Sequence, residues 1–446
     1  MAATTDVLVI GAGAAGLSAA GQLASAGLSV AILEARSRLG GRLFTQTDPE
    51  LNVPIELGAE FIHGLPPEIW APLQANKTVI TEVSGEPWCS ENGAPHPCNF
   101  FQKVDQILER MDDRLPDESF SSFLRRLNIA TGNDPSHAEA ARRALAYVVG
   151  FNAADPDRVG VHWLVQGMRA EEKIEGHRAF RSAQGYADLL SWLRQEVQAS
   201  HARVYTDTVV ESVQWRRGHA TTTTRSGDQF SSRSALVTLP LGILKASPGE
   251  IGAVRFSPDF PPEKVQALAH MEMGHVLRIT LRFRTRFWET MVDSRDPEKT
   301  LANMSFLLSQ DEWFPTWWTT APRQLPVITG WAPFRCADKL GNMSRSAIIE
   351  QSLRSLGNIL GVDHEFLANE LKEAHFHDWQ ADPFSRGAYS YGAVGADGAQ
   401  AALASPLEDT VFFAGEATDI TGNNGTVHAA LASADRATKE ILRSLK

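Results

Sequence analysis

The chain of 446 residues carries 42 lysine and arginine against 53 aspartate and glutamate side chains, a formal net charge of −11. With 43% hydrophobic and 21% charged residues, extensive disorder is not expected, because enough apolar surface exists to offset the chain entropy lost on folding. The length suggests roughly two or three domains, and the acidic balance argues against a nucleic-acid-binding protein.

The first expected elements form a strand–turn–helix–strand unit. An apolar β-run at residues 6–10 is followed by a glycine-rich turn, a helix that ends at Gly27, and a second β-run at residues 28–33. Glu34 then follows the first glycine by 34 − 11 = 23 residues, near the ~20 expected of a dinucleotide-binding unit. The turn lets a pyrophosphate approach the backbone and the helix N-terminus, while Glu34 would accept hydrogen bonds from a ribose. The expected contacts in this turn are Gly11, Gly13, Ala14, Ala15 and Gly16.

A second group of nucleotide-type signals follows this unit. Gly40 and Gly41 form another glycine pair, and Arg42 after them can pair with phosphate. Near the other end of the chain, Glu416 follows Gly415 and an apolar run, where its carboxylate would suit polyol hydroxyls. Taken singly, Arg42 is better interpreted as a surface arginine and Glu416 as a helix cap.

Between these two regions, the pattern is helical and polar from about residue 100 to 200, with a loop expected at residues 132–135. β-runs are expected at residues 201–213, 221–224 and 235–239, and an alternating run at residues 276–283. A last strand is expected at residues 410–414, before a glycine-rich turn and a helix from about residue 426. The nucleotide-type signals at both ends and near residue 200 predict two interleaved domains.

The cysteines and the apolar segments suggest a location. Cys89, Cys98 and Cys336 are too few for a disulfide framework, and they lack the paired spacing of a zinc site. No stretch reaches the roughly 18 uncharged apolar residues of a membrane span, and Asp6 leads directly into a structured motif rather than a signal peptide. We therefore expect a soluble cytoplasmic protein with no metal, membrane or nucleic-acid partner.

Together these motifs resemble the FAD-dependent amine oxidases, a family that includes monoamine oxidases, polyamine and spermine oxidases and flavin-type histone lysine demethylases. The N-terminal motif is shared with phytoene desaturases and protoporphyrinogen oxidases, so it indicates the cofactor better than the reaction. Residues 239–245 (LPLGILK), 387–391 (GAYSY) and 425–428 (GTVH) look most like the polyamine oxidase and demethylase branch. The resemblance also covers residues 11–42, 57–64, 378–379 and 412–418.

The resemblance implies an α/β (α+β overall) fold in two interleaved parts. A Rossmann-type FAD-binding domain would comprise residues 1–78, 186–247 and 385–446. A substrate-binding domain with a mixed sheet and flanking helices would comprise residues 79–185 and 248–384. The active site would lie between them.

The resemblance also implies the contacts that hold FAD. Val210 would meet the adenine, Trp379 would stack near the isoalloxazine, and the Val427 N–H would approach the flavin O2 side. Ala388 stands where monoamine oxidases carry the cysteine that bonds the flavin, so non-covalent FAD is expected. Further contacts are expected from Ala35, Arg36, Gly41, Gly58, Ala59, Glu60, Phe61, Gly415 and Thr426.

On the substrate side, an aromatic wall would orient a neutral amine without keeping it protonated. Tyr389 matches one wall, and Thr426 replaces the second tyrosine of monoamine oxidases, which favours a longer or bulkier substrate. His63 lies where spermine-type enzymes place a histidine that contacts polyamine nitrogens; a surface loop is the alternative. Glu60 is a candidate for steering a distal cation. For residues 171–172, two glutamates, we prefer a solvated helix face to a cavity entrance.

Arg278 stands where the family's lysine holds a water near flavin N5. Arginine keeps the positive charge, but it is planar, longer and effectively never deprotonated, so it is not equivalent. Either O2 use persists with altered geometry, which we favour, or another electron acceptor is used.

The expected activity is FAD-dependent amine oxidation, in which hydride-type transfer from the amine Cα gives an imine, then an aldehyde or ketone, while O2 becomes H2O2. A polyamine or another primary or secondary amine is the favoured substrate class. L-amino acids are less expected, because no matching arginine motif for their carboxylate is found. The alternatives are a flavin dehydrogenase or desaturase with a non-oxygen acceptor, and a flavoprotein whose cofactor is structural.

Overall fold

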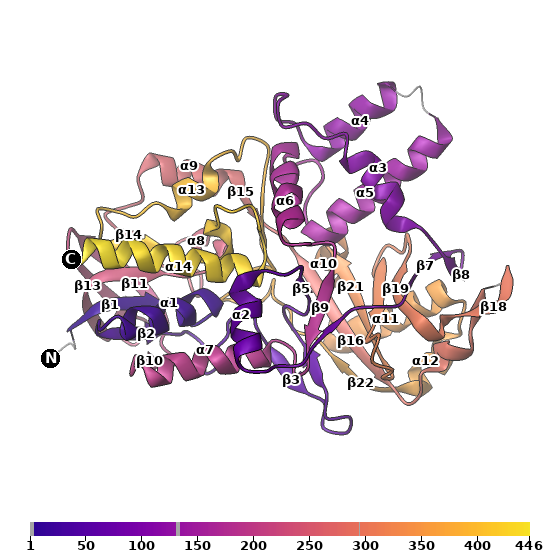
Figure 1. Ribbon diagram of the computed structural model, residues 1–446, viewed down its shortest axis with the longest axis horizontal. Coiled ribbons are helices and arrows are strands. Elements are labelled where there is room, and N and C mark those ends of the chain that lie inside the picture. Colours follow the sequence, from indigo (N-terminus) through magenta and orange to yellow (C-terminus); the bar gives the residue numbers. More distant parts are fainter. Residues whose placement is uncertain (1–3, 131–133, 294) are drawn as a thin grey trace.

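The computed structural model describes residues 4–130, 134–293 and 295–446, so the loop expected at residues 132–135 lies largely outside the described residues. Two sheet-based lobes lie side by side, and a group of helices covers one end of the boundary between them (Figure 1). Within the described ranges, no helix is both long and apolar enough to cross a bilayer.

The first lobe is built on a sheet whose parallel strands run in the order β10-β2-β1-β13-β24. Their bounds are β10 Arg203–Tyr205, β2 Val30–Leu33, β1 Thr4–Ile10, β13 Gln229–Val237 and β24 Val411–Phe413. Residues 7–10 are buried on both faces, as expected of a parallel sheet that is covered on both sides. One face packs on α1 (Ala14–Ser25), α7 (Ala187–Ala199) and α14 (Val427–Ser444). These strands come from the two ends of the chain and its middle.

Three more strands extend this sheet from β13: β12 (His219–Thr224) and β11 (Val210–Arg216) pair antiparallel, and β14 (Arg255–Ser257) pairs parallel to β11. The run expected at residues 201–213 is divided into β10 and β11. The reason is a turn in which Asp207 has a φ of +52° and Thr208 N–H donates to the Glu34 carbonyl. This turn places Val210 close to the end of β2. β14 joins the sheet although it lies beyond the expected domain boundary at residue 247.

The glycine turn folds as its spacing predicts, between β1 and α1. Gly11 has a φ of +103°, a conformation that side chains rarely adopt. A Cβ on Gly16 would overlap the Gly11 carbonyl oxygen, so the helix can start this close to the strand only with glycine there. The second glycine pair lies against the first, because Gly40 N–H donates to the Ala12 carbonyl.

The second lobe contains a seven-stranded sheet in the order β22-β16-β21-β20-β19-β7-β8. Their bounds are β22 Leu371–His375, β16 Val276–Phe283, β21 Val327–Pro333, β20 Thr316–Thr319, β19 Met304–Leu308, β7 Glu86–Glu91 and β8 Ala94–Pro97. The apolar face packs on helices that include α11 (Arg345–Leu360) and α12 (His364–Glu370). All eight residues of β16 are buried, although its sequence alternates, because segments of the first lobe cover the polar side chains.

Between the lobes lie the hairpin of β3 (Thr45–Thr47) and β4 (Pro54–Glu56), and a small sheet of β5 (Ile62–His63), β9 (Ala179–Ser182) and β6 (Ile80–Glu82). The helices at the end of the boundary are α3 (Phe100–Leu108), α4 (Phe120–Ala130), α5 (Pro135–Asn152) and α6 (Val161–Lys173) (Figure 1). α2 (Pro67–Ala75) packs on the first lobe with α7 and α14.

One disulfide is present, although the sequence analysis considered the three cysteines too few for a disulfide framework. Cys89 on β7 and Cys98 just after β8 form a disulfide, because the antiparallel hairpin brings their Cα atoms to 5.6 Å. Cys336 is a free thiol. Since disulfides are typical of oxidising compartments, the cysteines no longer support the expected reducing cytoplasm.

Candidate functional site

A cavity of about 2150 Å³ is lined by residues from both lobes and from the helices beside them. Pockets for a single small ligand usually measure about 300–1,000 Å³, so this space is large enough for a dinucleotide together with a substrate. Of the site residues expected from the sequence, Gly16 does not line the cavity; it serves the packing of α1 against Gly11 instead. The other expected residues all contribute to the lining.

Glu34 joins the glycine turn to the end of β2. One carboxylate oxygen accepts from Ala12 N–H at 2.8 Å, and the other accepts from Arg36 N–H at 2.9 Å. Each carboxylate oxygen has a further lone pair, and the side chain faces the cavity. This arrangement suits acceptance of ribose hydroxyls, beside glycines whose missing Cβ leaves room for a pyrophosphate.

Glu416 and Arg42 meet in the cavity wall. Arg42 Nη1 donates to Glu416 Oε1 at 2.9 Å and to the Ala388 carbonyl at 2.7 Å, and Ser390 Oγ donates to Glu416 Oε2 at 2.6 Å. Glu416 is 4% exposed. Neither side chain adopts the alternative considered from the sequence, a surface arginine or a helix cap. Ser390 is a partner that the sequence analysis missed.

One hydrogen bond holds the Trp379 indole: its N–H donates to the Leu57 carbonyl at 2.7 Å. A Cβ on Gly58 would overlap the Arg42 carbonyl oxygen and would lie 3.4 Å from the Trp379 ring. Glycine at this position therefore permits three chain segments to meet at one wall of the cavity.

Tyr389 and Thr426 lie at the start of α14. The Tyr389 hydroxyl donates to the Phe151 carbonyl at 2.6 Å, and burial raises the pKa of Tyr389, so it stays protonated. Gly425 has a φ of +69°, and a Cβ there would lie 3.0 Å from the Tyr389 ring. The Thr426 hydroxyl caps α14, because it accepts from Ala429 N–H and donates to the Asn423 carbonyl. The first N–H groups of a helix have no intrahelical partner, which leaves that of Val427 available.

His63 lies in β5, paired with Ala179, and not in a surface loop. Its ring lies 5.3 Å from that of Phe151, and burial lowers the pKa of His63 to about 4. Burial, and then the proximity of His63, lowers the pKa of His428 to about 3. Both imidazoles are therefore neutral at pH 7. His428 Nε2 is buried without a hydrogen-bond partner among the described residues, and the sequence analysis assigned this second histidine no role, although it is the last residue of the GTVH motif.

Aromatic side chains form much of the wall beside His63. Residues 313–331 contain four tryptophans, to which the sequence analysis assigned no role. Of these, Trp318 and Trp331 line the cavity, with ring centroids 5.7 Å apart. Trp317, the neighbour of Trp318 on β20, is buried on the other face of the sheet. Neighbouring residues of a strand face opposite sides of the sheet, so their adjacency on β20 could have predicted that only one of these two tryptophans faces the cavity. Phe61, Phe101, Tyr147, Phe151 and Phe306 also line the cavity.

Glu171 differs from its neighbour Glu172 on α6. Glu172 is exposed, as the preferred solvated helix face requires. Glu171 lines the cavity, and burial raises the pKa of its carboxyl to about 7. It makes no ion pair with any described residue, so the solvated-face interpretation is wrong for Glu171.

Arg278 reaches the cavity wall from β16. Its Nη1 donates to the Gly58 carbonyl at 3.0 Å, and its Nη2 donates to Glu60 Oε2 at 2.6 Å. Glu60 also accepts from Arg181 Nε at 2.6 Å and from Trp318 Nε1 at 3.1 Å. Because these donors occupy the carboxylate of Glu60, it is not free to steer a distal cation, as the sequence analysis had suggested.

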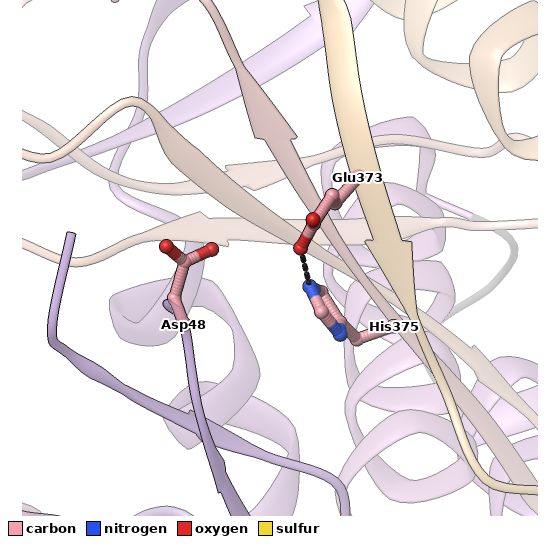
Figure 2. Close-up of side chains that lie close together, drawn as sticks. All are labelled: Asp48, Glu373 and His375. Carbon is pink, nitrogen blue, oxygen red and sulfur yellow. Dashed lines mark ion pairs between the residues drawn. The ribbon is translucent and has the colours of Figure 1, made fainter. Parts of the chain in front are cut away.

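A group of metal-ligand types lies outside the cavity. The ligand atoms of Asp48, Glu373 and His375 lie within 4.8 Å of one another, and Figure 2 shows Glu373 pairing with His375 opposite Asp48. Arg282 Nε lies 2.7 Å from Asp48 Oδ2, and its Nη2 lies 3.4 Å from Glu373 Oε1. The guanidinium supplies the counter-charge, so we interpret the group as an ion-pair cluster that holds the β3–β4 hairpin to β16 and β22.

A sequence profile described as "Flavin containing amine oxidoreductase" matches residues 14–76 and 100–442. Among curated proteins, "Polyamine oxidase 4" of Oryza sativa subsp. japonica is 26% identical over 99% of this chain and 90% of its own length. "Lysine-specific histone demethylase 1 homolog 3" of Arabidopsis thaliana is 26% identical over 92% of this chain, which covers only 28% of that longer protein.

Solved structures show the same fold. Wild-type putrescine oxidase bound to putrescine superposes with a TM-score of 0.80 over 99% of both chains, at 19% sequence identity. The mixed α/β fold class expected from the sequence is therefore confirmed.

Proposed function

Because the chain belongs to the family of flavin-containing amine oxidoreductases, we propose that it oxidises a primary or secondary amine that carries a second cationic group, such as a polyamine. The family resemblance, the enzyme class and the FAD cofactor expected from the sequence are confirmed by that membership. The substrate, the electron acceptor and the roles of individual residues are the proposal.

The observation that carries the proposal is the continuity of one cavity. The FAD-motif residues Glu34, Arg42 and Glu416 and the substrate-side residues Tyr389 and Trp318 line the same space. A bound FAD would supply a hydride acceptor for the amine Cα and would pass the electrons to O2, giving H2O2. Water then hydrolyses the released imine to an aldehyde or ketone.

The residues of this chain fit a non-covalent FAD. Ala388 offers no thiol for a bond to the flavin, and its carbonyl is held by Arg42. The N-terminus of α14 faces the cavity at Val427, where its partial positive charge stabilises negative charge that develops on a bound ring. We propose that Trp379 lies beside that ring and that the Glu34 carboxylate binds the ribose.

The substrate side of the cavity favours the binding of a substrate that carries a cationic group. An amine must be neutral to react, and Tyr389, His63 and His428 provide a wall that is uncharged at pH 7. Glu171 is a carboxylate of this wall that makes no ion pair with a described residue, and it is placed to bind the ammonium at the other end of a diamine. Away from the FAD motifs, the lining includes seven acids against four arginines: Glu82, Glu91, Asp105, Glu139, Glu171, Glu172 and Asp311 against Arg142, Arg143, Arg178 and Arg278.

The relatives support this substrate class. Several are named polyamine oxidases, and one structural neighbour is putrescine oxidase with putrescine bound. Lysine demethylases are also among the relatives, so an alkylated lysine side chain is the second substrate to test.

The contacts of Arg278 support a second proposal for the electron acceptor. Two of its donor atoms are held by Glu60 and the Gly58 carbonyl, so it differs from the lysine that the family resemblance implies near N5. A dehydrogenase that passes electrons to an acceptor other than O2 is the alternative.

The test is anaerobic mixing of the FAD-loaded protein with putrescine, spermidine, spermine, benzylamine, N-methyl-lysine and L-amino acids, while flavin absorbance is followed. Polyamines should bleach the flavin fastest. Fastest bleaching by benzylamine or an amino acid would contradict the substrate class, and no bleaching would contradict amine oxidation.

Two further measurements use the same preparation. Admission of air should restore the absorbance with one H2O2 per amine oxidised, and slow reoxidation by air but fast reoxidation by a quinone would support the dehydrogenase. Denaturation should release free flavin, whereas flavin that stays with the precipitated chain would contradict the interpretation of Ala388.

A further inference from the structure

Glu60, Arg278 and Arg181 form a chain of ion pairs beside the cavity, and each comes from a different part of the sequence. Arg278 Nη2 and Arg181 Nε each lie 2.6 Å from a different oxygen of Glu60. The exposed fractions of the side chains are 7% for Arg278, 11% for Glu60 and 17% for Arg181. Ion pairs this buried are screened little by water or salt.

Arg181 anchors Glu60 from the side away from the cavity. Its Nη1 donates to the Ala321 carbonyl at 2.9 Å, and its Nη2 donates to the Thr319 carbonyl at 3.0 Å. Its guanidinium lies 4.7 Å from the centre of the Phe61 ring. Arg181 does not line the cavity, whereas Glu60 and Arg278 do. Glu60 is therefore held in one orientation by an arginine that has no contact with the reaction space.

Glu60 in turn determines the orientation of the Arg278 guanidinium at the cavity wall. The pairing with Glu60 and with the Gly58 carbonyl occupies both terminal nitrogens of Arg278. Its Nε is buried without a hydrogen-bond partner among the described residues. Trp318 limits movement on the remaining side, because its ring centre lies 5.7 Å from the Arg278 guanidinium and its N–H binds Glu60.

The three side chains carry two positive charges and one negative charge. Burial alone would raise the pKa of Glu60, but the guanidinium groups of Arg278 and Arg181 lower it, so Glu60 is ionised. Glu56, the next acid in this region, has a pKa raised to about 7 by burial and pairs with neither arginine. The net charge of the group is therefore about +1, and removal of Glu60 leaves two buried guanidinium groups uncompensated.

We propose that Glu60 is a positioning residue that fixes Arg278 beside the reaction space and, together with Arg181, sets the net positive charge there. The proposal rests on the proposed function in one respect, namely that FAD occupies this cavity. A fixed positive charge stabilises the reduced, more negative form of a bound flavin. Glu60 therefore acts on the electron affinity of the cofactor through Arg278, without touching the reacting atoms.

The test measures the midpoint potential of bound FAD by equilibration with redox dyes, which needs no amine. Glu60→Gln keeps the size and one acceptor oxygen but raises the local charge, so the potential should rise. Arg278→Met leaves the neutral Glu60–Arg181 pair, so the potential should fall. The double variant Glu60→Gln/Arg181→Met returns the local charge to +1 and should bring the potential back toward that of the unmodified protein.

Asp48→Asn is the matched control. It breaks a carboxylate–arginine pair of similar length, 2.7 Å, to Arg282 on the same strand, but it lies outside the cavity. It should lower the melting temperature and leave the flavin potential unchanged. A shift in potential as large as that of Glu60→Gln would overturn the proposal. Shifts of the same sign in Glu60→Gln and Arg278→Met, or no shift in either, would also overturn it.

A second readout uses the cofactor-free chain and is independent of flavin or amine. The melting temperatures of Glu60→Gln, Arg278→Met and Glu60→Gln/Arg278→Met form a double-mutant cycle. If Glu60 holds Arg278, this second double variant should lose less than the sum of the single losses, because either single variant already removes the Glu60–Arg278 interaction. Additive losses would overturn the pairing, whereas failure of amines to reduce the flavin would contradict only the proposed function.

Discussion

Arg42 Nη1 lies 2.9 Å from Glu416 Oε1, so two motifs that are 374 residues apart in the sequence share one ion pair. The pair is completed by the Ala388 carbonyl and the Ser390 hydroxyl. It connects the second glycine pair, the GAYSY segment and the C-terminal motif. The wall proposed to hold FAD thus depends on both ends of the chain.

Arg42→Ala should weaken FAD retention, because it removes a cation from the wall and leaves Glu416 buried without its counter-charge. A hydrogen bond to a charged group contributes about 1.5–3 kcal/mol, which corresponds to roughly ten- to hundredfold weaker binding. The flavin-to-protein ratio after gel filtration at several dilutions measures the loss. Arg386→Ala, which breaks a more exposed pair with Glu250, is the control. Equal retention in the two variants would contradict the role of Arg42.

Tyr389→Ala should leave FAD bound but slow its reduction by amine by about tenfold or more, because the aromatic wall that orients the amine is lost. Tyr389→Phe removes only the hydrogen bond to the Phe151 carbonyl and should have a smaller effect. Stopped-flow measurement of flavin bleaching distinguishes the two. Unchanged reduction in Tyr389→Ala would remove this residue from the site.

Glu171→Gln should raise the KM for a diamine by about tenfold and change the KM for a monoamine little, because only the diamine has a second ammonium to bind. Glu172→Gln is the matched control, since it changes the exposed neighbour on the same helix. An equal rise in KM for the diamine and the monoamine would show that Glu171 does not bind the second ammonium group.

The same residue predicts a pH dependence. Because burial raises the pKa of Glu171 to about 7, its carboxylate forms only as the pH rises through that value. The KM for a diamine should therefore fall as the pH rises from 6 to 8, and this pH dependence should be lost in Glu171→Gln. A KM that falls equally in the variant would assign the titration to the substrate amine.

The Cys89–Cys98 disulfide should leave one reactive thiol, Cys336, in the denatured, unreduced protein, and three after reduction. Closing a short loop stabilises a fold by roughly 2–3 kcal/mol. The Cys89→Ala/Cys98→Ala variant should therefore have a lower unfolding midpoint in denaturant. Thiol titration and mass spectrometry check the count. Three reactive thiols without reductant would contradict the disulfide.

Much of the first lobe follows from local sequence. The strand, the glycine turn at Gly11, the helix and the acid at Glu34 interact within about 25 residues, so their spacing alone indicates the βαβ unit. The resemblance carried by short motifs also indicated FAD, and the structure places all but Gly16 of the expected residues on the cavity. The boundaries of β10 and β11 were missed because the turn between them depends on a contact with Glu34.

The features that were missed depend on distant segments. Nothing near Arg278 in the sequence indicates that Glu60 binds it, since 218 residues separate them. Likewise, the sequence does not distinguish Glu171 from Glu172, which both line the cavity, and only the packing of α6 makes Glu171 partly buried and leaves Glu172 exposed.

The sequence by itself determined the cofactor, the family and the positions of the motifs, because these reside in short segments whose backbone geometry is locally encoded. The tertiary structure alone decided which charges are paired, which side chains face the cavity, and that Cys89 meets Cys98. Those properties depend on burial and on distances between segments, which are set only when the two lobes close on one another.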